Sequence, residues 1–261
     1  MKNFLAVGSV LLALASIAPV NAADMAVKAP TTPDAAYDPW AGFYAGASVG
    51  ARWSDVQWHS LSFTPGFPGP FVPNNVNNPA QIGSTSARLG GYFGYNWRIA
   101  PSWLAGFEGD IAWANSSKTV TPFPGTAGIV GPAAAGSDFS TAKLGWDASI
   151  RGRVGVLVNP SWLLYGTGGV AWQEIKTVST CSPGGYCAIP VTGTSSTDKA
   201  GWTVGAGVET ALAGHWLVRV EYRYADFGHV TNILPPAPGS GLTSSISVKT
   251  NTALLGLAYK W

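Results

Sequence analysis

Residues 216–224 read W-L-V-R-V-E-Y-R-Y and divide by parity into two chemical classes. The even-numbered positions hold only aromatic residues and valine: Trp216, Val218, Val220, Tyr222 and Tyr224. The odd-numbered positions are mostly charged: Leu217, Arg219, Glu221 and Arg223. Successive side chains of a β-strand point to opposite sides, so this strand has one apolar face and one charged face. A soluble sheet would bury the apolar face in a core, whereas a membrane barrel would turn it to lipid.

The same alternation recurs along the chain and decides between these two folds. It predicts strands at 42–53, 88–99, 103–113, 144–158, 162–175, 202–212, 216–224 and 248–261, although the two that begin at 162 and 202 are rich in glycine and alternate less clearly. Charged side chains of both signs share the inward parity: Arg52, Arg88, Arg98, Glu108, Asp110, Asp147, Arg151, Arg153, Glu209, Arg219, Glu221 and Arg223. Large apolar residues take the other parity, as a transmembrane β-barrel requires. The predicted fold is therefore all-β, an eight-stranded antiparallel up-and-down transmembrane barrel.

The connections between these strands are alternately short and long. Short turns fall at 100–102, 159–161 and 213–215, and a Trp-Leu pair follows each one. The segments at 59–85, 116–142, 178–200 and 228–246 are long and rich in Pro, Gly, Ser, Thr and Asn. Bacterial outer-membrane barrels keep short turns in the periplasm and long loops outside, so we expect four long extracellular loops and both termini in the periplasm.

Tryptophans gather at both ends of the predicted strands. One group lies at the short-turn ends: Trp40, Trp97, Trp103, Trp162, Trp216 and Trp261. The other lies at or near the opposite ends: Trp53, Trp58, Trp113, Trp146, Trp172 and Trp202. Trp has an apolar ring and one N–H donor, and it is favoured where hydrocarbon meets head groups. The two groups predict two aromatic girdles.

The first residues are typical of a secretory signal. Lys2 precedes an apolar run that Gly8 interrupts and Pro19 ends, short of the roughly 20 apolar residues that a membrane helix needs. We expect cleavage between Ala22 and Ala23. The predicted organisation is a signal at 1–22, a flexible periplasmic lead-in at 23–39 and an outer-membrane barrel at 40–261.

Charge and composition argue against a nucleic-acid binder. The formal charge of +2 falls to +1 when Lys2 leaves with the signal, because 14 basic residues (15 − 1) then face 13 acidic ones. Charged residues make up only 11% of the chain, which suits an outer wall that faces lipid. We expect no cofactor, no metal site and no nucleic-acid partner.

Three short segments carry a resemblance to a known family. They are 22–25 (A-A-D-M), 40–46 (W-A-G-F-Y-A-G) and 221–228 (E-Y-R-Y-A-D-F-G). They resemble the outer-membrane immunogenic proteins of alphaproteobacteria, opacity-like surface barrels related in architecture to the OmpA transmembrane domain. The resemblance implies an eight-stranded barrel and a major surface antigen, sometimes described as a porin, but no single activity. The chain departs from the family in ending on Trp261 rather than Phe, and Leu257, Tyr259 and Trp261 would still form an aromatic terminal signal for the barrel assembly machinery.

The size of the barrel leaves two interpretations of its charged interior. Eight strands enclose a space that side chains just fill, whereas general diffusion porins use about 16 to 18 strands. The inward charges would then form a salt-bridged plug, because buried charges must be paired. Alternatively, the excess of arginine would line a narrow or gated path that favours anions.

Cysteine and histidine offer little chemistry. Cys181 and Cys187 flank a Pro-Gly-Gly turn in an exported segment, which predicts a local disulfide, with two free thiols as the alternative. His59 and His229 leave neighbouring regions of the predicted rim, so a haem or metal contact there is a hypothesis. Asp226 with His229 suggests a hydrolytic dyad, but no nucleophile is identified beside them, so an outer-membrane lipase or lipid A-modifying enzyme is a weaker alternative.

We therefore expect a structural and antigenic surface protein and not an enzyme, because loops on a rigid scaffold commonly carry function. A small-solute channel is the alternative. The expected partners are outer-membrane lipid and lipopolysaccharide, the barrel assembly machinery, and surfaces of a host or phage. The sequence does not specify an oligomeric state.

Overall fold

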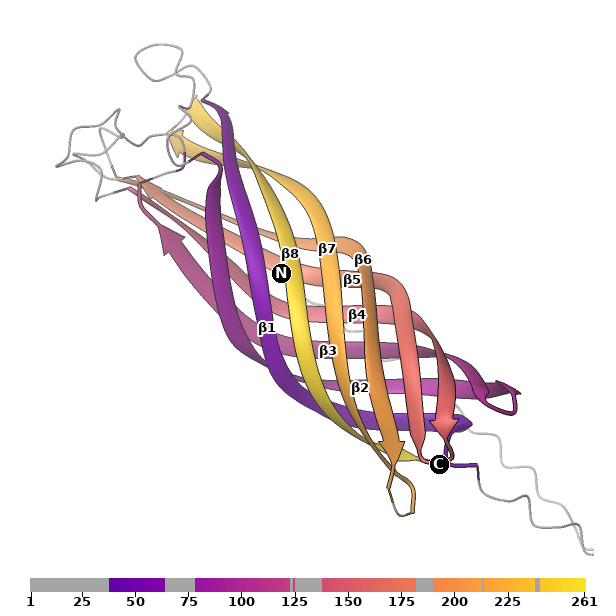
Figure 1. The fold of residues 1–261 in the computed structure, drawn as a ribbon. Helices are drawn as coiled ribbons and strands as arrows, with labels where there is room; N and C mark the ends of the chain where they lie inside the picture. Colours follow the sequence, from indigo (N-terminus) through magenta and orange to yellow (C-terminus); the bar gives the residue numbers. More distant parts are fainter. Residues whose placement is uncertain are drawn as a thin grey trace, which may run out of the picture. The chain divides into compact units, whose positions relative to one another are not determined.

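Eight antiparallel strands close into one barrel, in which each strand pairs with its sequence neighbours and the last pairs with the first (Figure 1). The strands of this computed structural model are β1 Gly42–Phe63, β2 Ala80–Ala100, β3 Trp103–Val120, β4 Phe139–Asn159, β5 Trp162–Cys181, β6 Val191–Ala211, β7 Trp216–Ala237 and β8 Ser240–Lys260. The predicted fold class is thereby confirmed. The structure describes residues 38–63, 78–122, 124, 138–181, 190–212, 214–237 and 240–261, so the predicted signal and most of the predicted lead-in lie outside the described residues.

The three Trp-Leu pairs mark strand starts, as the sequence predicts. Trp103, Trp162 and Trp216 open β3, β5 and β7 directly after the short turns. At the same end of the barrel, the backbone amide of Trp261 donates to the carbonyl of Phe43, 3.1 Å away. The first and last strands therefore begin and end beside the short turns.

The strands are much longer than the predicted ones, and this corrects the predicted loop lengths. They run for 18 to 22 residues, whereas a strand that crosses a membrane needs about 9 to 11. Much of the sequence expected in loops, such as 80–85 and 191–200, is β-strand. These segments lack lipid-facing residues because roughly half of each strand extends beyond a bilayer, so an apolar alternation does not reveal them.

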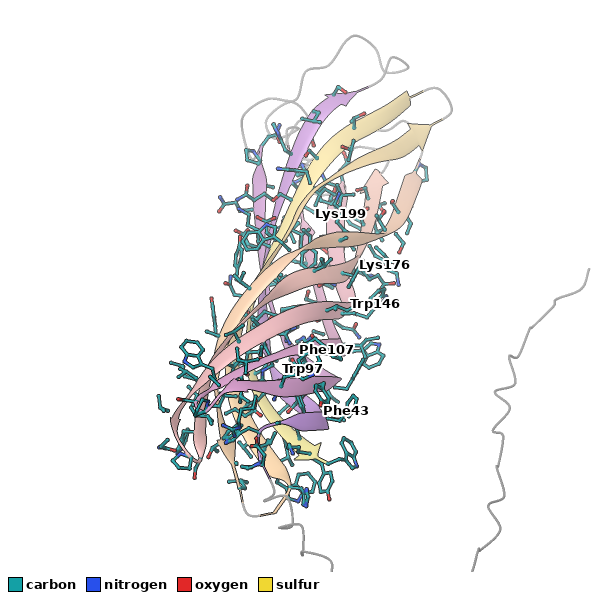
Figure 2. All side chains as sticks on the ribbon, turned by 90° about the vertical axis from the view of Figure 1, so that its right-hand side faces the viewer. Phe43, Trp97, Phe107, Trp146, Lys176 and Lys199 are labelled. Atoms are coloured by element: carbon teal, nitrogen blue, oxygen red, sulfur yellow. The ribbon has the colours of Figure 1, made fainter. Side chains whose placement is uncertain are left out.

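Lipid-facing residues form one belt, next to the short turns. The exposed large apolar side chains of β1, β2 and β7 include Phe43, Val49, Phe93, Val220 and Tyr222. Figure 2 shows Phe43, Trp97 and Phe107 low on the wall, Trp146 near its middle, and Lys176 and Lys199 above them. Eight of the tryptophans are exposed at the edges of this belt: Trp53, Trp97, Trp103, Trp113, Trp162, Trp202, Trp216 and Trp261.

Two tryptophans do not belong to the girdles, contrary to the sequence-based expectation. Trp40 is 1% exposed and Trp58 is 0% exposed. Trp40 precedes β1 and turns into the end of the barrel, while Trp58 shares the inward parity of Arg52 and lies in a core above the belt. Among the described residues, no helix has the length and hydrophobicity of a membrane span.

Above the belt the chemistry of the two faces is reversed. The interior holds an apolar cluster, which we call the upper core: Val56, Trp58, Ile82, Ala142, Leu144, Ala171, Ile175, Ala225, Phe227, Ile246 and Val248. The outer face at the same level carries exposed polar residues such as Asp55, Thr85, Lys176 and Thr194. This part of the barrel is built like a water-soluble β-protein, with its apolar side chains inside.

The ring of hydrogen bonds opens at two seams in this upper part. The β2–β3 ladder runs only from Ala100–Trp103 to Leu89–Trp113, although both strands continue beyond it. The β6–β7 ladder likewise ends at Trp202–Asp226. The strands above the belt therefore form two four-stranded sheets, β7-β8-β1-β2 and β3-β4-β5-β6, which face each other across the upper core.

Candidate functional site: the closed interior

Eleven of the twelve predicted interior charges meet in one ion-pair network inside the belt. Its members are Arg52, Arg88, Glu108, Asp110, Asp147, Arg151, Arg153, Glu209, Arg219, Glu221 and Arg223. Their side chains are 0 to 13% exposed. Alternate residues of a strand face the same side, which explains why parity alone locates them.

Glu108 and Asp110 of β3 are the centre of this network. Glu108 accepts from Arg151 at 2.5 Å and also pairs with Arg219. Asp110 pairs with Arg88 at 2.7 Å and with Arg223 at 3.0 Å. Each of the two carboxylates therefore joins guanidinium groups that come from different strands.

The remaining carboxylates extend the network to both sides. Glu221 pairs with Arg151 at 2.7 Å and with Arg223 at 2.9 Å. Asp147 pairs with Arg52 at 3.1 Å and with Arg88. Glu209 pairs with Arg153 at 2.8 Å, and Arg153 joins the network through Glu108 at 3.9 Å. Six arginines thus face five carboxylates, and every one of the six has a carboxylate partner.

Arg98 is not part of the interior, which corrects its predicted place. It has the inward parity but lies two residues before Ala100, the last residue of β2, and it is exposed at the end of the barrel. Its guanidinium pairs with Asp38 at 2.7 Å, and both side chains are about 30% exposed (30% and 31%). Arg98 holds the pKa of the Asp38 carboxyl below its usual value through this hydrogen-bonded pair.

Three tyrosines complete the network, and sequence reasoning did not assign them a role. The Tyr44 hydroxyl donates to Glu108 at 3.0 Å and the Tyr165 hydroxyl donates to Glu221 at 2.9 Å. The guanidinium of Arg219 lies 3.6 Å from the ring centre of Tyr92, as a cation–π contact. Tyrosine therefore satisfies carboxylate oxygens and also covers guanidinium faces.

Glycines opposite two of these tyrosines supply a sequence signal that could have found them. Tyr44 pairs with Gly94 and Tyr165 pairs with Gly207 in the ladders. A Cβ atom on either glycine would collide with the facing tyrosine ring. An inward tyrosine opposite an inward glycine therefore indicates a ring that lies across the neighbouring strand.

An apolar layer, which we call the lower plug, closes the interior below the network. It contains Trp40, Tyr44, Tyr92, Leu104, Leu163, Tyr165, Leu217 and Ala258. Leu104, Leu163 and Leu217 are the second residues of the Trp-Leu pairs, so each pair places its Trp in the girdle and its Leu in the plug. The Trp40 indole donates to the carbonyl of Pro160 at 3.0 Å, which fixes its ring across the mouth.

The upper core closes the interior on the other side, and Arg52 lies at the junction. Its guanidinium pairs with Asp147 below and donates to the carbonyls of Ala114 and Leu144. The barrel thus has three successive layers inside: an apolar plug, a charge network and an apolar core.

The other predicted residues lie on the outside of the barrel. Leu257, Tyr259 and Trp261 are exposed on the lipid face of the last strand. Cys181 ends β5, while Cys187 lies outside the described residues, so the predicted disulfide stays a prediction.

The histidine sites of the alternative hypotheses are also external. His59 and His229 are exposed on β1 and β7, with β8 between them. The Asp226 carboxylate accepts from the backbone amide of Gly228 at 2.8 Å, so it shapes a bulge in β7. Within the described part of the chain, no group of three or more His, Cys, Asp or Glu residues could hold a metal ion.

A belt of lipid-facing residues around a closed, charged interior defines the class: the protein is an outer-membrane β-barrel. A family model confirms the class. The chain belongs to the outer membrane protein beta-barrel domain family, whose model matches residues 10–260.

Comparison with individual proteins confirms the resemblance that the sequence motifs indicated. The 31 kDa outer-membrane immunogenic protein of Brucella melitensis biotype 1 is 30% identical over 248 residues, which cover 92% of this chain and 92% of that protein. Among solved structures, OmpT, an outer membrane protease from Escherichia coli, matches with a TM-score of 0.52, 12% identity and coverage of 88% of this chain and 98% of that one. OprG from Pseudomonas aeruginosa matches with a TM-score of 0.51, 14% identity and coverage of 85% and 97%. At these identities the two structures are similar to this chain in fold alone.

Proposed function

We propose that this protein is a non-conducting outer-membrane anchor that holds a folded, water-exposed stem and its loops at the cell surface, where they act as an antigen and contact site. The observation that carries the proposal is the charge network closed by apolar layers on both sides. Breaking buried, hydrogen-bonded ion pairs costs several kcal/mol, so opening a path through these layers would be expensive. The immunogenic relative from Brucella supports a surface role.

Conductance of the refolded mature protein in a planar bilayer tests the closed interior. We expect no current steps from protein whose folding is established by its heat-shifted gel band. Reproducible, anion-selective steps would overturn the proposal and favour the narrow channel instead.

The surface stem can be tested on whole cells with matched cysteine variants. In a background in which Cys181 and Cys187 are serine, we expect a membrane-impermeant maleimide to label Lys176→Cys, because Lys176 is exposed above the belt. Val220→Cys, at 60% exposure on the lipid face, serves as the control and should stay unlabelled. Equal labelling of both would contradict the assigned belt.

Export and assembly belong to the same proposal. We expect the mature chain to begin at Ala23, which mass spectrometry of the purified protein measures. The assembly machinery would read Leu257, Tyr259 and Trp261, so Trp261→Ala should lower the amount inserted and Trp261→Phe should not. Insertion that is unchanged by Trp261→Ala would remove the terminal residue from the signal.

A further inference from the structure

The seam between β2 and β3 leaves two strand edges unpaired just above the belt. The last ladder pair is Leu89–Trp113, but β2 continues to Ala80 and β3 to Val120. No ladder pair joins the described segments 80–88 and 114–120. Such edges present backbone N–H and C=O groups that have no partner in the sheet.

A cavity of about 410 Å³ occupies this seam and is open to solvent. Five hydroxyl- or amine-bearing residues line it: Ser54, Ser84, Thr85, Ser117 and Lys118. Extending the observed register of the ladder would pair Thr85 with Ser117 and Ser84 with Lys118. The cavity therefore stands where the next rungs of the ladder would be, as a polar window in the wall. We call it the seam window.

Buried hydroxyl groups around the seam window lack partners. Ser54 is 4% exposed and lines the cavity, and its hydroxyl makes no hydrogen bond. The hydroxyls of Ser86 and Ser116 are also buried and unpartnered, and the extended register places these two residues opposite each other below the cavity. A buried polar group without a partner is costly, so the window is suited to a polar ligand that supplies acceptors.

Lys118 gives the seam window a positive charge. No carboxylate lies within ion-pair distance of Lys118 or of Lys143, which the ladder places beside Ser117, among the residues that the structure describes. By contrast, the Lys176 ammonium pairs with Glu174 at 2.7 Å. Asp55 lies on the outer face opposite Gly83, and it is not among the lining residues.

The seam window lies at the depth of the lipid head groups, so a lipid headgroup is the anion within its reach. Trp53 borders the cavity and Trp113 belongs to the last ladder pair below it, and both are exposed members of the outer girdle. Aromatic girdles lie at the level of the lipid head groups. Apolar residues of the belt, such as Leu89 and Phe93, continue the wall below the window, where acyl chains would pack.

We propose that the seam window binds a phosphate group on the sugar headgroup of an outer-leaflet glycolipid. Lys118 pairs with the phosphate, while the serine hydroxyls and the open strand edges donate to the phosphate and sugar oxygens. The volume is that of a small ligand pocket, so it admits a phosphorylated sugar and leaves the acyl chains outside. The site depends only on the position of the belt and not on whether the interior conducts.

The test is titration of the refolded mature protein, in detergent, with lipid A that carries its phosphate groups, followed by native mass spectrometry. Lys118→Gln should weaken binding about tenfold or more, because it removes a charge-assisted hydrogen bond. Gly83→Leu is a second variant that keeps the charge: Gly83 lines the window and a Cβ there meets no atom within 4 Å, so the added side chain should narrow the window without a steric clash. Lys176→Gln is the matched control and should bind like the wild type. The heat-shifted gel band checks that each variant is folded.

Two further ligands separate the possible sources of phosphate. Dephosphorylated lipid A should bind weakly and show no difference between the wild type and Lys118→Gln. Inorganic phosphate should compete only at concentrations far above those of lipid A. Equal effects of Lys118→Gln and Lys176→Gln, or binding that survives both Lys118→Gln and Gly83→Leu, would overturn the site. Competition by inorganic phosphate at concentrations comparable to those of lipid A would overturn the lipid assignment.

Discussion

The part of the barrel inside the membrane and the part above it use the same strands with opposite chemistry. On β1, the inward side chains are Ser48 and Arg52 in the lower part and Val56 and Trp58 in the upper part. The outward side chain changes at the same level, from exposed Trp53 to exposed Asp55. Parity decides which way a side chain points, whereas the medium outside decides which chemistry that face needs. Lipid outside allows charges inside, and water outside requires an apolar core.

Two irregular ladder positions lie where these two parts meet. The β4–β5 register shifts between Leu144 and Asp147, so the first faces the upper core and the second faces the charge network. On β7 the register shifts between Asp226 and His229, around Gly228 with φ 63°. Phe227 and Val230 both pack on the upper core, although they differ in parity. A positive φ favours glycine, so Gly228 allows the bulge that keeps both apolar residues inside.

The largest expected effect tests the charged interior of the lower part. Glu108→Ala would leave Arg151 and Arg219 without one of their buried partners. We expect the free energy of unfolding to fall by about 3 to 5 kcal/mol, as measured by denaturant titration in lipid vesicles. Asp198→Asn, on the exposed outer face of β6, is the control and should change it by less than about 0.5 kcal/mol. An unchanged free energy of unfolding in Glu108→Ala would mean that the network adds nothing to stability.

The apolar interior of the upper part should also respond strongly. Phe227 is 3% exposed in the upper core, so Phe227→Ala should lower the free energy of unfolding by about 3 to 4 kcal/mol. Phe93→Ala, on the lipid face at 63% exposure, removes the same atoms outside any core and should cost less. Hydrogen exchange of the β7 amides would show whether the upper part opens on its own. An equal cost of both changes would remove the distinction between the two parts.

An arginine placed on the outer face should destabilise the lower part, which faces lipid, and not the upper part, which faces water. Val220→Arg points into lipid near the middle of the belt and should cost about 2 to 4 kcal/mol. Thr194→Arg points outward from β6 above the belt, into water. It should change the free energy of unfolding by less than about 0.5 kcal/mol. The same unfolding measurement compares the two variants. A penalty for Thr194→Arg as large as that for Val220→Arg would place the upper part in the membrane.

Sequence alone predicted the lower part well because lipid imposes a strict alternation on it. Parity placed eleven interior charges, and the Trp-Leu pairs placed the starts of β3, β5 and β7. The partners of Arg151 or Arg223 could not be predicted, because pairing across the interior depends on the stagger of the closed barrel. Arg98 has the right parity but lies near the end of β2, where it pairs with the partly exposed Asp38, and parity carries no information on depth.

The sequence predicts loops in the upper part because its outer face follows no apolar pattern. Segment 191–200 is made mostly of Thr, Ser and Gly, which matches a loop in composition, yet it forms half of β6. Among the side chains that the structure describes, the upper core takes its buried apolar residues from β1, β2, β4, β5, β7 and β8 and none from this segment, and each of these strands contributes only one or two. The seam window lies where the β2–β3 ladder ends although both strands continue, and no local sequence pattern marks that point.

The smallest expected effect concerns Asp38, which lies outside both parts, at the mouth of the lower plug. Its carboxylate accepts from the backbone amide of Trp40 at 2.9 Å and pairs with Arg98. Because this pair is partly exposed, Asp38→Asn should lower the free energy of unfolding by about 0.2 to 1 kcal/mol at pH 7. Arg98 lowers the carboxyl pKa from 3.8, so the contribution is complete above that pH and disappears as the pH falls through the lowered pKa.

The control for this prediction is a double-mutant cycle with Arg98→Gln. If Asp38 acts through the ion pair, the double variant should lose little more than either single variant. If instead the bond to Trp40 is the main contribution, Arg98→Gln should be nearly silent while Asp38→Asn still destabilises the lower plug. A difference between wild type and Asp38→Asn that grows on acidification would contradict both explanations, since protonation can only remove what the charged carboxylate contributes.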